Sequence, residues 1–295
     1  MNNEIPLWLD TDIGSDIDDA VALAYLLREP RCRLLGLSTV TGPVADRARV
    51  ASALALAAGR PDLPIFPGYS DTLSGPGQPQ CPQAEVLPQV KHRPDFRPDP
   101  DAALAALLAA ARNRPGSLTL LTIGPLSNVA RFFQAAPQLP ALLKEVVLMA
   151  GVFHPDQPRA EWNVLCDPVA ADLVARAPVA RRWYGLDVTL QCWLPVDEVR
   201  RRFQGPVLRT VARFADVWFR RRDRITFHDP LAAAAVFEPD LCRYESARVD
   251  VLTSGQCPGR TLPRPMPPGQ ARADSLALQV DPQRFFSRYF SVFNL

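Results

Sequence analysis

The sequence predicts an α/β fold in which a mostly parallel central sheet is flanked by helices. Short apolar runs alternate with longer segments of helical period, which is typical of parallel strands joined by crossover helices. The chain of 295 residues is 47% hydrophobic and 22% charged, as expected of a globular protein with one large or two small cores. No internal repeat or clear domain boundary is evident, so we expect a single domain over residues 1–295.

Five strands and five helices follow in order along this alternation. The predicted strands are residues 6–9, 34–39, 118–123, 146–150 and 182–185. The predicted helices, most of them bounded by residues that favour helix caps, are 18–28, 45–58, 101–112, 128–134 and 168–176. Proline-rich residues 76–100 and 258–268 have too few periodic apolar residues to join the core, so both are predicted to be loops. The first of these loops either covers a pocket or is a surface excursion.

Composition and charge argue against several functional classes. The formal net charge is +2 and the arginines are scattered among acidic residues, so no nucleic-acid partner is expected. The one dense basic run, residues 220–224, is predicted to be a solvated helix end. The six cysteines include no Cys-x-x-Cys pair, which argues against a zinc site and favours a cytoplasmic location. No targeting segment or long apolar window is evident, so no membrane partner is expected.

A run of acidic residues between the first strand and the first helix is the clearest candidate site. Its five carboxylates within ten residues are Asp10, Asp12, Asp16, Asp18 and Asp19. Repulsion of about 1 kcal/mol per close pair, even in a high dielectric, indicates that a cation belongs among them. Oxygen ligands without a neighbouring Cys or His favour Ca²⁺ or Mg²⁺ over Zn²⁺. We expect one of Asp10 and Asp12 to hold the metal and the other to orient a partner through hydrogen bonds.

Further polar segments fall where predicted strands end or helices begin. In parallel sheets, ligands bind outside the carboxyl ends of the strands. Four segments are placed to meet the acidic run there: residues 124–128, 149–151, 160–163 and 227–232. The carbonyl before Gly124 is a possible neutral metal ligand, while His228 and Asp229 offer an imidazole and a carboxylate, or simply a helix cap.

Taken together, these segments resemble the inosine-uridine preferring nucleoside hydrolase family. The family's mark is an N-terminal Asp-x-Asp-x-Gly run that ends in Asp-Asp-Ala, and residues 10–20 match it with two extra residues after the glycine. The similarity continues, in the family's order and over most of the chain, through residues 122–128, 147–151, 160–163, 167–168 and 228–232. The resemblance implies hydrolysis of the N-glycosidic bond of a ribonucleoside to ribose and a free base.

The resemblance also implies roles for particular residues. It implies a Ca²⁺ ion held by Asp12, Asp19, the carbonyl of Ile123 and Asp229. It implies a ribose site formed by Asp18, Met149, Glu161 and Asn163. A metal-bound water would attack the sugar, with Asp12 as its base, and His228 either protonates the leaving base or is structural. Relatives of this kind are commonly homodimers or homotetramers.

The chain departs from the family pattern in three places. Pro43 stands where the family usually has Asn, and the Asn expected to contact the 5′-hydroxyl aligns with Pro155 or Asp156. The His-Gly-x-Asp-Gly-Leu-Gly motif is missing from residues 76–100, and His92 is not carried over as its replacement.

Two other functions are alternatives to the hydrolase hypothesis. An aspartyl-phosphate phosphatase also has Asp-x-Asp after its first strand, but it needs a lysine for the phosphate, and the only lysines, Lys91 and Lys144, lie in no motif. The other alternative is a non-catalytic or altered-substrate relative that keeps the metal and the ribose-diol site.

Overall fold

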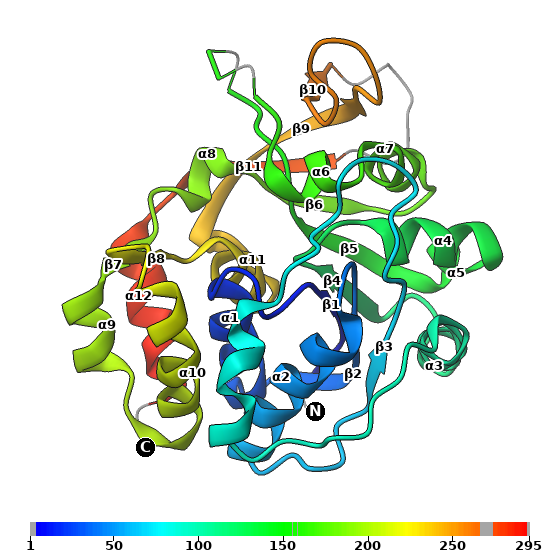
Figure 1. The fold of residues 1–295 in the computed structure, drawn as a ribbon. Coiled ribbons are helices and arrows are strands. Elements are labelled where there is room, and N and C mark those ends of the chain that lie inside the picture. Colours follow the sequence, from blue (N-terminus) through cyan, green and yellow to red (C-terminus); the bar gives the residue numbers. More distant parts are fainter. Residues whose placement is uncertain (1–3, 155, 158, 266–273, 294–295) are drawn as a thin grey trace.

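The computed structural model of the protein describes residues 4–154, 156–157, 159–265 and 274–293. Within these residues, nine strands form one sheet in the order β10-β9-β11-β6-β5-β4-β1-β2-β3 (Figure 1). All neighbours from β3 to β11 pair in parallel, and β9 is antiparallel to both β11 and β10. The strands are β1 (Ile5–Thr11), β2 (Cys32–Thr39), β3 (Ile65–Pro67), β4 (Leu118–Thr122), β5 (Leu143–Met149), β6 (Arg181–Tyr184), β9 (Cys242–Val251), β10 (Thr261–Arg264) and β11 (Asp274–Val280). This mostly parallel sheet confirms the predicted fold class.

Helices cover both faces of the sheet (Figure 1). They are α1 (Asp18–Arg28), α2 (Val44–Ala57), α3 (Pro100–Arg112), α4 (Ser127–Ala135), α5 (Leu139–Leu142), α6 (Trp162–Cys166), α7 (Pro168–Arg176), α8 (Leu186–Thr189), α9 (Val196–Arg202), α10 (Gly205–Trp218), α11 (His228–Phe237) and α12 (Pro282–Ser291), with the 3₁₀ helices η1 (Pro82–Gln89) and η2 (Pro239–Leu241). A separate antiparallel pair consists of β7 (Trp193–Pro195) and β8 (Arg224–Thr226). No helix in the described part of the chain is both long and apolar enough to cross a membrane.

All five predicted strands and all five predicted helices are present, but the two predicted loops need correction. Residues 76–100 contain η1. Its residues Val86 and Leu87 are buried in the core because η1 packs against α2 and α10. Residues 258–268 contain β10, an edge strand in which Pro263 is tolerated because one side of an edge strand needs no ladder hydrogen bond. Residues 266–268 lie outside the described residues.

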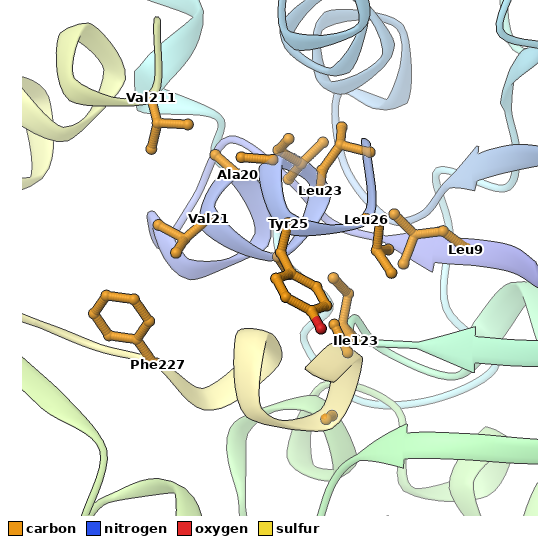
Figure 2. Close-up of a cluster of buried hydrophobic side chains, with 14 of the residues drawn as sticks. Leu9, Ala20, Val21, Leu23, Tyr25, Leu26, Ile123, Val211 and Phe227 are labelled. Atoms are coloured by element: carbon orange, nitrogen blue, oxygen red, sulfur yellow. The ribbon is translucent and has the colours of Figure 1, made fainter. Parts of the chain in front are cut away.

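The core has two layers because consecutive side chains of a strand point to opposite faces. In β1, Leu7 and Leu9 pack in the layer with α1, whereas Trp8 packs in the layer with α3 and α4. Figure 2 shows the first layer, in which α1 lies between Leu9 of β1 and Phe227, which precedes α11. Trp8 requires a glycine opposite it in β2, since a Cβ on Gly36 would lie 2.7 Å from the indole. The buried β1–α1 unit thus rigidly supports the acidic run that joins its two elements.

Candidate active site

A cavity of about 550 Å³ opens where β1, β4 and β5 end. These three strands are neighbours in the sheet, so the segments that follow their carboxyl ends meet at one edge. Every residue to which the family resemblance assigns a role lines this cavity: Asp12, Asp18, Asp19, Ile123, Met149, Glu161, Asn163, His228 and Asp229. The structure therefore brings the predicted residues together, and the role assigned to each stays a prediction.

The floor of the cavity is a compact group of three carboxylates. Asp18, Asp19 and Asp229 are buried and place carboxylate oxygens within 4.8 Å of one another. They come from the first turns of α1 and α11, which pack side by side, and the amide of Asp229 donates to Asp18 Oδ2 over 3.4 Å. Burial raises the pKa of each carboxyl group well above its usual value, and mutual repulsion raises it further. An all-oxygen group of this charge fits a hard divalent cation.

The geometry differs in one detail from the metal site implied by the sequence. Asp18, assigned to ribose, lies as close to Asp19 and Asp229 as a shared ligand would. Asp12, assigned to the metal, lies outside this trio but lines the same cavity, and its charge raises the pKa of Asp19 and Asp229. Thr11 Oγ1 donates to Asp19 Oδ1 and so orients that carboxylate.

Asp10 has a different environment from Asp12. Because side chains alternate along β1, Asp10 points to the sheet face that carries Trp8, away from α1. Its Oδ2 accepts hydrogen bonds from Ser38 Oγ and from Asn128 Nδ2, the latter at 2.8 Å. Asp10 therefore links β1, β2 and α4 and leaves the cavity to Asp12, which follows the end of the strand.

A fully buried arginine donates hydrogen bonds to the acidic run. Arg47 of α2 has 0% exposure and donates to the carbonyls of Thr41, Asp12, Ile13, Gln78 and Gln80 and to Ser15 Oγ. Burial raises the pKa of Asp12, and the Arg47 charge opposes this shift. Arg47 could not be recognised from the sequence, because an arginine in a helix normally lies on a solvated face.

The wall opposite α1 is held by α6. Glu161 caps this helix, and its carboxylate accepts from the amides of Asn163, Val164 and Gly151 at 2.8, 3.2 and 3.3 Å. Burial raises the pKa of Glu161 to about 7. Asn163 Nδ2 donates to the carbonyls of Ile123 and Met149 at 3.0 and 3.1 Å. The Ile123 oxygen keeps a second lone pair for another partner, such as the predicted metal.

His228 lies at the start of α11 with its Nδ1 2.7 Å from Thr189 Oγ1. Burial lowers the pKa of this imidazole to about 4, and the charge of Arg159 lowers it further. The ring is therefore neutral near pH 7 and carries one N–H, which is on Nε2 in the tautomer whose Nδ1 accepts from the Thr189 hydroxyl.

The outer wall contains residues that the sequence analysis did not assign to the site. From the proline-rich segment come Gln78, Gln80, Pro82 and Glu85, which fits the alternative that this segment covers a pocket. Trp162, 49% exposed, and Trp218 also line the cavity. The basic run after α10 is exposed, as predicted for a helix end, but its first three arginines also line the mouth.

The positions where the chain departs from the family pattern lie apart from this lining. Pro43 caps α2, Asp156 is exposed, and His92 Nδ1 lies 3.0 Å from the carbonyl of Val90. Among the described residues, none of these three lines the cavity. Pro155 lies outside the described residues.

Known proteins resemble this chain in sequence and in fold. A family model described as inosine-uridine preferring nucleoside hydrolase matches residues 7–287. Uridine nucleosidase 1 of Arabidopsis thaliana is 31% identical over 274 residues, which cover 87% of this chain and 81% of that protein. A non-specific ribonucleoside hydrolase of Salmonella newport is 31% identical over 270 residues, which cover 87% and 86%. Among solved structures, a purine-preferring ribonucleoside hydrolase from Gardnerella vaginalis superposes with a TM-score of 0.82 at 23% identity over 97% of each chain.

Proposed function

The chain belongs to the inosine-uridine preferring nucleoside hydrolase family, and we propose that it cleaves the N-glycosidic bond of ribonucleosides with Ca²⁺ bound at the floor of the cavity. Family membership makes it an N-glycosyl hydrolase. The observation that carries the proposal is the buried trio Asp18, Asp19 and Asp229, whose carboxylate oxygens lie within 4.8 Å of one another. Such a group would be strongly self-repelling without a cation.

Asp12, Asp19, Asp229 and the carbonyl of Ile123 would hold the ion, with Asp18 beside them. When bound, a hard cation lowers the pKa of a neighbouring water and orients adjacent hydroxyls. Carboxylate and carbonyl oxygens suit Ca²⁺, which accepts about six to eight oxygen ligands. The Ile123 carbonyl is already fixed by Asn163, so it needs little reorganisation.

The residues of the cavity divide the chemical work between them. Asp12 takes a proton from the attacking water, while Asp18, Met149, Glu161 and Asn163 hold the ribose. As the bond to the base breaks, positive charge grows on the sugar, and the surrounding carboxylates stabilise it more than they stabilise the neutral substrate. His228, neutral near pH 7, donates its N–H as a hydrogen bond to the departing base.

We further propose that residues 1–295 form one domain and that the protein is a cytoplasmic homodimer or homotetramer. The uninterrupted nine-stranded sheet of the described residues supports a single domain. Exposed Leu190 and Trp193, each 43% accessible and close in sequence, offer apolar surface for a subunit contact. Free thiols at Cys32, Cys81, Cys166, Cys192 and Cys242 are compatible with a reducing compartment.

A direct assay of liberated sugar tests the proposed function. The protein is incubated with uridine, cytidine, inosine, adenosine and guanosine, and reducing sugar and free base are measured. We expect equimolar ribose and base, loss of the activity after treatment with a chelator, and recovery on adding Ca²⁺. Binding of ribose without release of sugar from any nucleoside would instead identify a non-catalytic relative. Release of inorganic phosphate from phosphate esters would favour the phosphatase reading.

The metal is tested separately by calorimetry. Asp229→Ala should weaken Ca²⁺ binding by at least about tenfold, since it removes one charged ligand from the trio. Asp156→Ala is the matched control, because it removes an exposed carboxylate that does not line the cavity. Equal Ca²⁺ affinity in both variants would contradict the assignment of the metal site.

A further inference from the structure

Charge is segregated within the cavity. The floor carries carboxylates, whereas Arg220, Arg221 and Arg222 line the mouth in the turn between α10 and β8. Arg220 is engaged with Glu85 across the mouth, with Nη2 2.5 Å from Oε1. Two guanidinium groups therefore remain to face an incoming ligand.

Arg222 is held in place by its neighbours. Its guanidinium lies over the Trp218 ring, 5.4 Å from the centroid, and its Nη1 donates to the carbonyl of Arg221 at 3.3 Å. Its charge reaches into the cavity, since it lowers the pKa of Asp16. Ordering of this kind reduces the entropy that an arginine loses when it binds a ligand.

A further arginine affects the same cavity from a different part of the fold. Arg159 precedes α6 and does not line the cavity, but its charge lowers the pKa of His228. The residue assigned to the leaving base thus has a guanidinium within electrostatic range, independently of the basic run.

On the basis of the proposed function, we propose that Arg221 and Arg222 form a subsite for an anionic group of the riboside substrate. A ribose whose diol is held at the floor directs the rest of the molecule toward the mouth. The carboxylates of the floor would repel an anionic substrate unless cations compensated at the point where its charge comes to lie. Guanidinium groups bind carboxylate and phosphate through paired hydrogen bonds. The substrate class is therefore a riboside with a carboxylate on its base or a phosphate on its 5′ oxygen.

Paired substrates separate this subsite from a general effect of charge. The ratio of kcat/KM for uridine 5′-monophosphate to that for uridine is measured, and likewise the ratio for the 6-carboxylate of uridine to that for uridine. In the double variant Arg221→Ala/Arg222→Ala, we expect one of the ratios to fall about tenfold at low salt, and less at high salt because surface charges are screened. The control Arg209→Ala removes an exposed arginine of α10 that does not line the cavity and should keep the wild-type ratios.

The outcomes distinguish an anion on the sugar, an anion on the base and the absence of a subsite. A fall confined to the 5′-monophosphate pair places the anion on the sugar, and a fall confined to the carboxylate pair places it on the base. If both ratios are unchanged, or if Arg209→Ala lowers them equally, the subsite does not exist and the arginines merely offset the charge of the floor.

An equilibrium measurement keeps the two proposals distinguishable. If wild-type protein releases no sugar from any riboside, the proposed function fails. The subsite is then tested by calorimetric binding of ribose 5-phosphate against ribose in the presence of Ca²⁺, and of orotate, the carboxylated free base, against uracil. We expect the double variant to lose about tenfold in affinity for one of the two anions relative to its neutral partner. Unchanged relative affinity for both anions would overturn the subsite.

Discussion

Asp10 and Asp12 are two residues apart, yet the fold gives them different tasks. Asp10 is still inside β1 and is hydrogen-bonded to Ser38 and Asn128, whereas Asp12 follows the strand end and lines the cavity. We therefore predict that Asp12→Asn keeps the fold but lowers kcat by about 10²- to 10⁴-fold, the usual contribution of a general base. Circular dichroism and the melting temperature check the fold, and exposed Asp156→Asn is the control. Near wild-type turnover in Asp12→Asn would refute its role as the base.

For a substitution of Arg47 we predict a loss of stability and not of catalysis. Its guanidinium has 0% exposure and donates to six acceptors, which lie in the acidic run, at Thr41 and in residues 78–80. Arg47→Met leaves buried carbonyls without donors, so we expect the free energy of unfolding in urea to fall by about 3 kcal/mol or more. Arg49→Met, on the same helix with an ion pair to Asp46, should cost less than about 1 kcal/mol. Equal losses would show that Arg47 is an ordinary helix residue.

At the residue scale, the acidic residues of the cavity floor could be predicted from the sequence, but the arginines Arg47 and Arg222 could not. Asp12 and Ile123 follow the ends of β1 and β4, and Met149 is the last residue of the neighbouring β5, so their convergence is predictable from the order of elements alone. Arg47 and Arg222 carry no such signal. An arginine in or after a helix is usually solvated. Only the path of residues 78–80 shows that Arg47 is buried, and only the position of the α10–β8 turn brings the exposed Arg222 to the cavity.

At the scale of elements, most strands and helices could be predicted as far as β6, where they alternate along the chain, but not beyond it. Strands β1, β4 and β5 are almost wholly buried and contain near-continuous apolar runs, whereas β3 has only three residues. Beyond β6, β9 is antiparallel and largely exposed on one face, so its pattern resembles that of a loop. The two core residues of η1, Val86 and Leu87, could not be predicted because the proline-rich segment around them has no apolar periodicity.

Two helix caps make a matched prediction at this scale. Asp167 and Asp99 both precede a helix that has Pro at its first position, and each accepts from the amide of the third helical residue. Asp167 is also buried and accepts from the amides of Leu73 and Ser74 and the hydroxyl of Ser127 at 2.7, 3.0 and 2.6 Å. We predict that Asp99→Ala costs about 1 kcal/mol, the usual loss of a cap. Asp167→Ala should cost about 3 kcal/mol or more, since several buried donors lose their partner. Equal losses in urea unfolding would contradict this difference.

At the scale of the whole molecule, the acidic floor depends on how α1 is fixed. Its first turn supplies Asp18 and Asp19, and its middle packs between β1 and α11 (Figure 2). It also contacts α12 at two points. Tyr289 of α12 donates to the carbonyl of Val21, and Arg288 pairs with Glu29 just beyond the end of α1. Residues nearly 270 positions apart thus hold the helix that carries the metal ligands.

The Glu29 junction predicts a pH dependence of stability. Its side chain has 0% exposure, and burial alone would raise the pKa, but hydrogen bonds from Arg31 and Tyr25 and the charge of Arg288 outweigh burial and hold it below the ordinary value of 4.5. A carboxyl group with a lowered pKa in the folded state adds stability above its unfolded pKa, and this stability is lost as the pH falls through the folded pKa. Glu29→Gln should therefore melt below wild type near pH 7, and the gap should close as the pH falls below 4.5.

The comparison of the two melting curves isolates the ion-pair cluster around Glu29. The carboxylates of the cavity lie at the other end of α1, so they titrate alike in both proteins and cancel in the difference. Glu238 pairs with Arg31 and Arg288 as Glu29 does, so it belongs to the same cluster. Exposed Glu245→Gln is the control and should show a small gap that does not change with pH. A constant gap between Glu29→Gln and wild type from about pH 7 to pH 3 would mean that the loss comes from packing and not from the ion pairs. A closing gap would show that the ion pairs at the far end of α1 stabilise the element on which the acidic floor is built.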